Sequence, residues 1–97
     1  MGYNLNFSQA LDLLKSGNAV RRRDWRGKRM WISYGKGNQA LEAEKFWNPH
    51  TKAFAEDNGG FAEVLPYIIM KTEDNKIQMG WAPSQADILA DDWELAV

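Results

Sequence analysis

The stretch PYIIMKTEDNKIQMGWAPSQADILADDWELAV, residues 66–97, decides the fold of this chain. Its first half predicts a β-hairpin over Leu65–Thr72 and Lys76–Trp81, because two apolar-rich runs flank a polar turn at Glu73–Asn75. Pro66 marks the beginning of the first strand, where a missing backbone N–H is tolerated. An antiparallel sheet is therefore expected in this part of the chain.

The residues after this hairpin predict a short capped helix and a final strand. Ser84 and Asp87 have the S-x-x-D spacing of a capping box, in which each side chain bonds the other residue's backbone N–H. The hairpin would deliver Trp81 to the start of that helix, so that its ring lies beside hydroxyl, amide and carboxylate groups. Trp93–Val97 is expected to add an edge strand.

The N-terminal part predicts another helix. Asn6 and Gln9 again have the spacing of a helix cap and its third helical residue, and Gly17 is typical of a helix end. The residues between them form one apolar stripe, which is expected to be core: Phe7, Ala10, Leu11 and Leu14.

A second hairpin is expected directly after this helix. Ala19–Trp25 reads as a strand, Arg26–Lys28 as a turn, and Met30–Tyr34 as the returning strand. Simple strand alternation would place Arg22 and Trp25 on opposite faces of the sheet.

The middle of the chain, about residues 35–64, is the least regular part. Gln39–Phe46 consists largely of good helix formers and predicts a helix that ends at Asn48–Pro49. Thr51–Glu56 is expected to make a further helical turn, and Asn58–Gly60 a plain turn. Such a long connection is typical of an insertion that forms a lid or contacts a partner.

Together these elements predict one α+β domain spanning residues 1–97. A small antiparallel sheet is built from two hairpins, two short helices cover it, and the insertion is irregular and partly helical. The length of 97 residues allows only a modest core, so that oligomerisation would be a natural way to bury more surface. The absence of a signal-peptide pattern and of a long apolar run makes the cytoplasm the expected location and argues against membrane association.

Charge and cysteine content narrow the function classes. The chain has no cysteine, which excludes disulfides, thiol catalysis and cysteine-based zinc sites. Its net charge is −1, yet six of its twelve basic residues lie between Arg21 and Arg29. Such a local cluster fits a few phosphates better than a long nucleic acid, which usually needs a larger basic surface. The alternative is a solvated strand edge whose charges deter aggregation.

The residues that could support catalysis are few. His50 is the only histidine and is expected in a surface loop. Four carboxylates near the C-terminus lie within one short segment, where they are typical of capping and solvation: Asp87, Asp91, Asp92 and Glu94. The chain has no phosphate-binding loop, nucleophile elbow or metalloprotease motif. An enzyme, a resident metal and a cofactor are therefore not expected.

The residues that could support binding are more numerous. The chain has five tryptophans, and a tryptophan that stacks on a base contributes about 1–3 kcal/mol. Trp25 and Trp81 are expected as stacking or pocket-wall residues, whereas the other three are expected mainly in the core: Trp31, Trp47 and Trp93. Contacts to ribose hydroxyls or base edges are expected from three polar residues, Ser84, Gln85 and Asp87. Phosphate contacts are expected from two arginines, Arg22 and Arg23.

Three sequence blocks together resemble one small phage and prophage family, the Thoeris anti-defence proteins of the second type. They are FSQALDLLKSGNAV from Phe7, the basic-aromatic RRDWRGKRMWI, and the C-terminal stretch from Leu65 with its PYIIMKT, GWAPSQ and LADDW motifs. The chain differs from the usual family pattern at four positions: Asp24, Arg26, Pro83 and Ala86.

The resemblance implies a phage-encoded protein that holds a cyclic nucleotide immune signal without cleaving it. The implied ligand is of the glycocyclic ADP-ribose type, with cyclic oligonucleotides as a further possibility, and the implied assembly is a homotetramer. Two other function classes remain open from the residues alone. One is a protein–protein interaction module, and the other is a nucleotide-cleaving enzyme that uses the C-terminal carboxylates.

Overall fold

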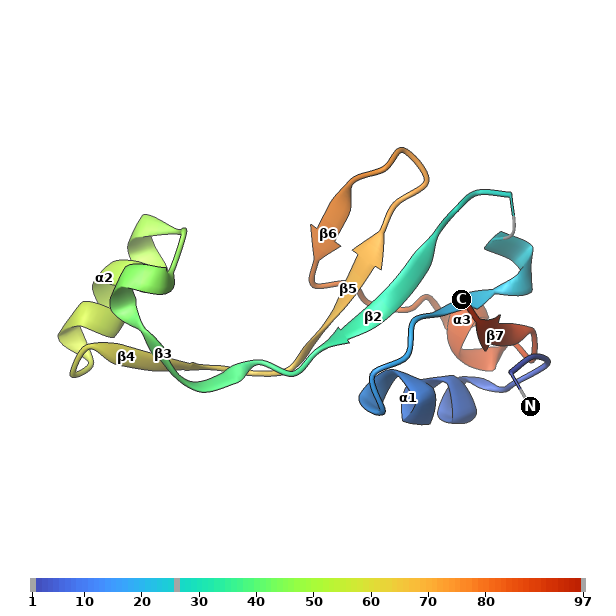
Figure 1. The fold of residues 1–97 in the computed structure, drawn as a ribbon, viewed down its shortest axis with the longest axis horizontal. Coiled ribbons are helices and arrows are strands. Elements are labelled where there is room, and N and C mark those ends of the chain that lie inside the picture. The colour runs from blue at the N-terminus through green and yellow to red at the C-terminus, as the bar shows by residue number, and fades with distance from the viewer. Residues whose placement is uncertain (1, 26, 97) are drawn as a thin grey trace. The chain divides into compact units, whose positions relative to one another are not determined.

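The computed structural model describes residues 2–25 and 27–96, which divide into two compact units. The first unit is made of the residues up to Gly35 and from Tyr67 onward, and the second is Lys36–Pro66 (Figure 1). Helices and antiparallel sheets occur together, which confirms the predicted α+β class. Among the described residues no helix is both long and apolar enough to cross a bilayer.

The first unit is built on a five-stranded antiparallel sheet with the strand order β6-β5-β2-β1-β7. Both predicted hairpins belong to this sheet, and the predicted final strand forms one of its edges. Four of the five strands are shorter than predicted, and β2 has the predicted length but is shifted by one residue: β1 (Val20–Arg22), β2 (Trp31–Gly35), β5 (Tyr67–Lys71), β6 (Ile77–Met79) and β7 (Trp93–Leu95). Val97, which the prediction included in the last strand, lies outside the described residues.

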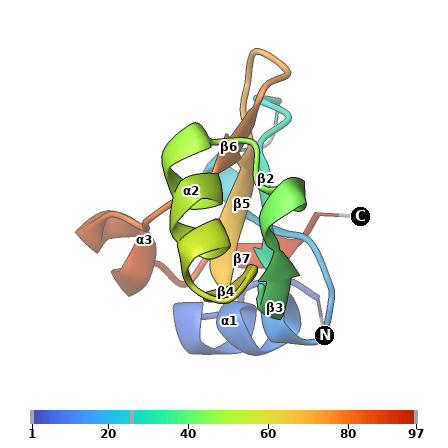
Figure 2. The ribbon, with the colours of Figure 1, turned by 90° about the vertical axis from the view of Figure 1, so that its left-hand side faces the viewer.

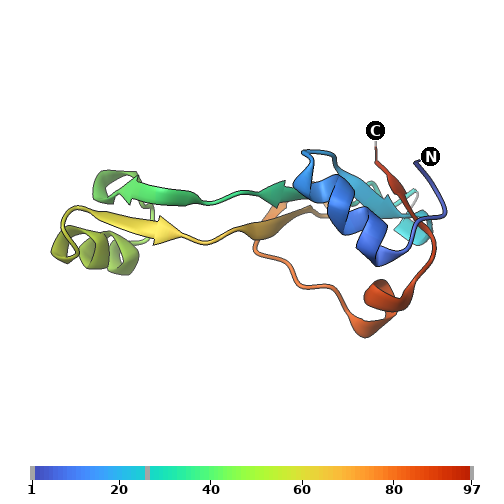
Figure 3. The ribbon, with the colours of Figure 1, turned by 90° about the horizontal axis from the view of Figure 1, so that it is seen from below.

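Helix α1 (Phe7–Lys15) has the predicted capping box. The Gln9 backbone N–H donates to Asn6 Oδ1 at 2.8 Å, and the Asn6 N–H donates to Gln9 Oε1 at 2.9 Å. The helix packs against β1, β2 and β7 through Ala10 and Leu14, which are fully buried (Figure 3). Just before the helix, Leu5 and Trp93 exchange backbone hydrogen bonds of 2.9 and 3.0 Å, so the N-terminal segment covers the edge at β7.

The prediction of a strand over Ala19–Trp25 is wrong in its second half. Strand β1 ends at Arg22, and the next three residues, Arg23–Trp25, form the 3₁₀ helix η1. The change occurs because the Arg23 N–H donates to the Asp92 carbonyl at 2.8 Å and the chain then turns inward. The alternation that placed Arg22 and Trp25 on opposite faces does not apply through this turn. Arg26, part of the turn predicted to follow, lies outside the described residues.

A row of four aromatic rings runs through the core of the first unit, and we call it the aromatic row: Phe7, Trp93, Trp25 and Trp81. The ring centroids of successive members are 5.5, 5.3 and 5.8 Å apart, and both tryptophan pairs meet edge to face. This geometry is favourable because it places the positive edge of one ring against the negative face of the next. Trp93 is fully buried and confirms its expected place in the core, whereas Trp31 is half-buried.

The second unit corrects the prediction for the middle of the chain. Its elements are β3 (Asn38–Glu42), the 3₁₀ helix η2 (Ala43–Lys45), α2 (Pro49–Asp57) and β4 (Phe61–Val64). The helix predicted over Gln39–Phe46 is wrong, because the first half of this segment pairs antiparallel with β4 and the pairing overrides its helix propensity.

The Asn48–Pro49 pair begins a helix in this unit and does not end one. Asn48 Oδ1 accepts hydrogen bonds from the backbone N–H groups of His50 and Thr51, at 2.9 and 3.1 Å. Pro49 occupies the first helical position, where its missing N–H costs nothing. The helix α2 packs against β4 (Figure 2). His50, expected in a loop, therefore lies in the first turn of α2, where it is exposed.

Large aromatic side chains of the second unit are exposed. Trp47 is 94% exposed, so the expectation that it packs in the core is wrong. Phe54 and Phe61 are 61% and 48% exposed, and the only buried residues of the unit, all of which the structure describes, are Ala55 and Ala62. The reason is size, since a unit of 31 residues with one two-stranded sheet and one α-helix cannot enclose so many rings.

Candidate functional site

The predicted capping box at the start of the last helix is present in the structure. Helix α3 (Gln85–Leu89) begins after Ser84, whose Oγ accepts the Asp87 backbone N–H at 3.1 Å. In return Asp87 Oδ2 accepts the backbone N–H and the hydroxyl of Ser84, at 2.9 and 2.8 Å. The three-residue spacing alone makes this possible, which is why it could be read from the sequence.

Arg22 reaches this box from strand β1. Its Nη1 donates to Asp87 Oδ1 at 3.0 Å, and its Nε donates to Asp92 Oδ1 at 2.9 Å. The remaining oxygen of Asp92 accepts the Asp24 N–H at 3.3 Å. We call these residues the charged corner: Arg22, Ser84, Asp87 and Asp92. Asp92 was not among the site residues predicted from the sequence. No local pattern pairs it with Arg22, and only the structure shows that this half-buried arginine has Asp92 as a partner.

The ion pairs shift the pKa values of the charged corner. Desolvation would raise the pKa of Asp87, but hydrogen bonds from Ser84 and Arg22 outweigh it and lower that pKa below the ordinary 3.8. The pKa of Asp92 is lowered in the same way, with desolvation opposed by Arg22 and by the Asp24 N–H. The hydrogen bond that Arg22 donates to Asp92 contributes most to raising the pKa of Arg22. All three groups therefore stay ionised at neutral pH.

These shifts predict an acid-sensitive contribution to stability. A carboxyl group whose pKa is lower in the folded than in the unfolded chain stabilises the fold above the unfolded value, 3.8. This stabilisation is lost as pH falls from about that value through the lower folded pKa. Urea denaturation at pH 7 and at pH 3 should show the loss in the wild type. Asp92→Asn should show a smaller loss, whereas Asp91→Asn, at an exposed neighbour, should match the wild type.

The two tryptophans predicted to bind ligand have different surroundings. Trp25 is only 6% exposed and belongs to the hydrophobic core. Trp81 is half-buried, since it packs against that core and meets Trp25 edge to face at 5.8 Å. The aromatic row thus ends in a ring that is partly accessible, a few residues before Ser84.

Other predicted site residues lie around this corner. Gln85, the first residue of α3, is exposed, and so is Arg23, whose Nη1 donates to Asn4 Oδ1. The basic cluster is partly neutralised, because Arg21 pairs with the buried Glu94 at 2.9 Å on the neighbouring strand and Arg22 pairs as described. Lys28 and Arg29 remain exposed. The structure therefore joins Arg22, Ser84 and Asp87 in one hydrogen-bonded group, whereas Trp81 lies three residues before Ser84 in the sequence.

Two surface hollows lie away from the predicted site residues. One, of about 480 Å³, belongs to the second unit and is lined by Glu42, Ala43, Glu44, Lys52, Glu56, Gly60 and Phe61. The other, of about 280 Å³, lies along α1 and is lined by Leu5, Gln9, Asp12, Leu13 and Ser16. Neither includes Trp81 or a member of the charged corner.

The fold and the site define a small α+β protein in which an aromatic row and a charged, hydrogen-bonded corner belong to the same unit. Known proteins are similar to this chain in sequence. The family model of the Thoeris anti-defense 2-like domain matches residues 5–96, and the chain belongs to that family. A relative named "Thoeris anti-defense 2", from Bacillus phage SP01, is 37% identical over 102 aligned positions, which cover 98% of each chain. The resemblance seen in the sequence is thus confirmed, and it supports a phage anti-defence role.

Proposed function

We propose that this protein binds a cyclic nucleotide immune signal of the glycocyclic ADP-ribose type and holds it without cleaving it. The observation that carries the proposal is a half-buried tryptophan, Trp81, that comes three residues before Ser84, the polar residue that caps α3. An aromatic face can stack on a base, and neighbouring polar side chains can bond ribose hydroxyls. Gln85 is exposed and free of a structural role in the capping box, so that its amide is available to a ligand.

The ion pairing of the carboxylates supports a protein that holds its ligand over one that cleaves it. Asp87 and Asp92 are both ion-paired with Arg22, and Glu94 is paired with Arg21. The contacts of Asp87 and Asp92 lower the pKa values of both carboxyl groups, which makes them weaker general bases. His50, which lies in the other unit, has no predicted site residue beside it in the sequence. The signal should therefore leave the protein chemically intact.

Calorimetric titration with glycocyclic ADP-ribose tests binding directly. A protein that competes with the signal's receptor needs nanomolar affinity, which corresponds to about −12 kcal/mol. After saturation, heat denaturation should release a molecule of unchanged mass that still activates the receptor. A cleaved product in the mass spectrum would identify an enzyme instead, and no heat of binding would reject the ligand class.

We also propose that the protein works as a homotetramer in the host cytoplasm. Its exposed large apolar side chains support association: Tyr3, Trp47, Phe54, Phe61, Leu65, Ile77, Met79, Ile88 and Leu89. Surface of this kind usually marks an interface.

Light scattering should therefore give a mass of about 44 kDa, four chains of 11.1 kDa. Trp47→Ala should shift the protein toward smaller species, whereas His50→Ala, at an exposed polar position of the same unit, should not. A wild-type mass of 11.1 kDa at micromolar concentration would contradict association. The exposed rings would then favour the interaction module, with a host protein as partner.

A further inference from the structure

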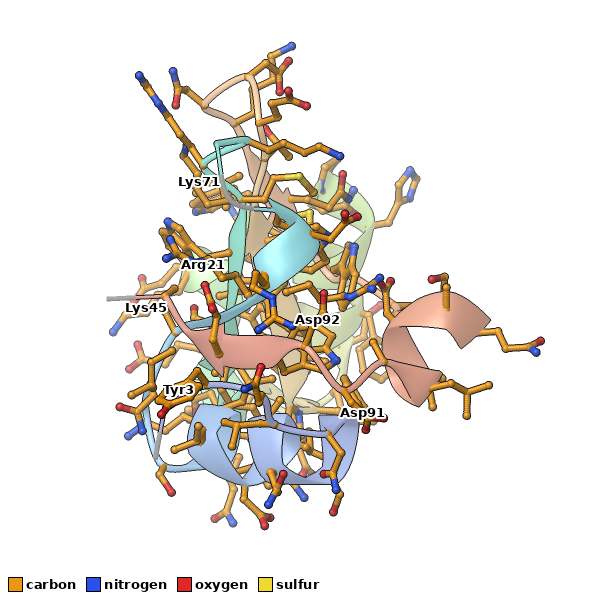
Figure 4. The ribbon with its side chains drawn as sticks, turned by 90° about the vertical axis from the view of Figure 1, so that its right-hand side faces the viewer. Tyr3, Arg21, Lys45, Lys71, Asp91 and Asp92 are labelled. Carbon is orange, nitrogen blue, oxygen red and sulfur yellow. The ribbon has the colours of Figure 1, made fainter. Side chains whose placement is uncertain are left out.

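Helix α3 is attached to the first unit with little help from apolar side chains. Ile88 and Leu89, its two large apolar residues, are 47% and 70% exposed, and Asp87 is the only buried residue of the helix. Figure 4 shows α3 standing to one side of the sheet. A five-residue helix has almost no stability of its own, so its position must come from tertiary contacts.

All three oxygen atoms of Asp87 accept hydrogen bonds, and two of them connect α3 to other parts of the unit. The carboxylate oxygen Oδ2 closes the capping box on Ser84, and Oδ1 accepts Nη1 of Arg22 at 3.0 Å. The backbone carbonyl accepts the indole N–H of Trp93, a core residue, at 2.9 Å. One residue thus links the helix to strand β1 and to the centre of the core.

Arg22 connects two residues of the α3 region, Asp87 and Asp92, to strand β1. Its Nε bonds Asp92, which follows α3, while its Nη1 bonds Asp87 within α3. The side chains of the three residues are 18%, 13% and 20% exposed, so that the pairs are mostly shielded from water. A guanidinium can serve two carboxylates at fixed angles from separate nitrogens, whereas a lysine ammonium is a single point charge.

We propose that Arg22 is a positioning residue that clamps α3 onto the sheet, and does not bind a ligand phosphate. The clamp would hold Ser84 and Gln85 beside Trp81 before ligand arrives, which reduces the ordering cost of binding. The effect on ligand rests on the proposed function, whereas the clamp itself exists with or without ligand. Because two carboxylates already pair with Arg22, it carries little unbalanced positive charge for an anion.

A matched pair of substitutions tests the clamp, Arg22→Lys and Arg21→Lys. Both change adjacent residues of β1, and both arginines use Nε for a carboxylate, but only Arg22 contacts α3. The readout is hydrogen exchange of the Trp93 indole N–H by NMR in the ligand-free protein, because this proton bonds the Asp87 carbonyl. Arg22→Lys should speed its exchange about tenfold, and Arg21→Lys should change it less than about twofold.

Exchange that responds equally to both substitutions would overturn the clamp. Melting temperatures recorded for both variants separate general destabilisation, which would also speed exchange throughout the core, from release of α3. Acceleration confined to Trp93 and the α3 amides supports the clamp.

Two ligands test the second half of the proposal, glycocyclic ADP-ribose and phosphate-free adenosine. If Arg22 only positions α3, Arg22→Lys should weaken both by the same factor, about tenfold when the docked form falls to a tenth of the population. Loss restricted to the phosphate-bearing ligand would identify a direct phosphate contact and overturn the positioning role. If the wild type binds neither ligand, the proposed function fails, and the exchange result alone decides the clamp.

Discussion

Trp93→Ala is expected to lower the free energy of unfolding by about 3–5 kcal/mol, the usual cost of removing a buried aromatic ring. The side chain is fully buried, its ring contacts Phe7 and Trp25 at 5.5 and 5.3 Å, and its indole N–H bonds the Asp87 carbonyl. Because small domains have only about 5–15 kcal/mol in total, this single change should remove a large part of the stability. Urea denaturation followed by circular dichroism measures it.

Trp93→Phe is the matched control for this prediction. A phenylalanine keeps most of the ring packing but leaves the Asp87 carbonyl without its donor, so that a smaller loss of about 1–3 kcal/mol is expected. The order of the two variants matters more than their absolute values. A loss below about 1 kcal/mol for Trp93→Ala would show that the centre of the core has been misplaced.

Trp25→Ala and Trp81→Ala should have opposite consequences for stability and binding. Trp25 is 6% exposed and sits within the core, so its truncation should cost about 3–5 kcal/mol of stability. Trp81 ends the aromatic row and is half-buried, so its truncation should cost about 1–3 kcal/mol of ligand binding, or about 5- to 150-fold. Thermal melts and calorimetric titration of the same two samples separate the effects.

Trp31→Ala serves as the control for this pair, because Trp31 is also half-buried but is not among the predicted site residues. It should leave the affinity unchanged. If Trp81→Ala binds as tightly as the wild type while its melting temperature collapses, Trp81 is a core residue and the proposed stacking surface is wrong. The sequence alone had assigned Trp25 and Trp81 the same role, and only their burial separates them.

Predictions from short-range patterns succeeded in this chain because both partners lie within one turn of helix. Asn6 with Gln9, and Ser84 with Asp87, are three residues apart, and each pair forms its box. The hairpin turn at Glu73–Asn75 is equally local, and the Thr72 N–H closes it onto the Lys76 carbonyl at 2.8 Å. Such motifs depend on backbone geometry that a few residues define by themselves.

Predictions failed where a distant segment competes with local preference. Gln39–Phe46 is rich in helix formers, yet its first half becomes part of strand β3 because it pairs antiparallel with β4. Strand β1 stops at Arg22 because Asp92, some seventy residues later, captures both the Arg22 side chain and the Arg23 N–H. Helix propensity differs by only tenths of a kcal/mol per residue, so that a few tertiary hydrogen bonds reverse it.

The sequence by itself determined the α+β class, the capped helices α1 and α3, the two hairpins of the first unit and the family resemblance, since these depend on local spacing and on short sequence motifs. Tertiary structure alone decided which tryptophan is core, which is surface, and what Arg22 does. Arg22 lies 65 and 70 residues from its two carboxylate partners. No local pattern encodes such a pairing, because burial and ion pairing depend on how all the elements pack together.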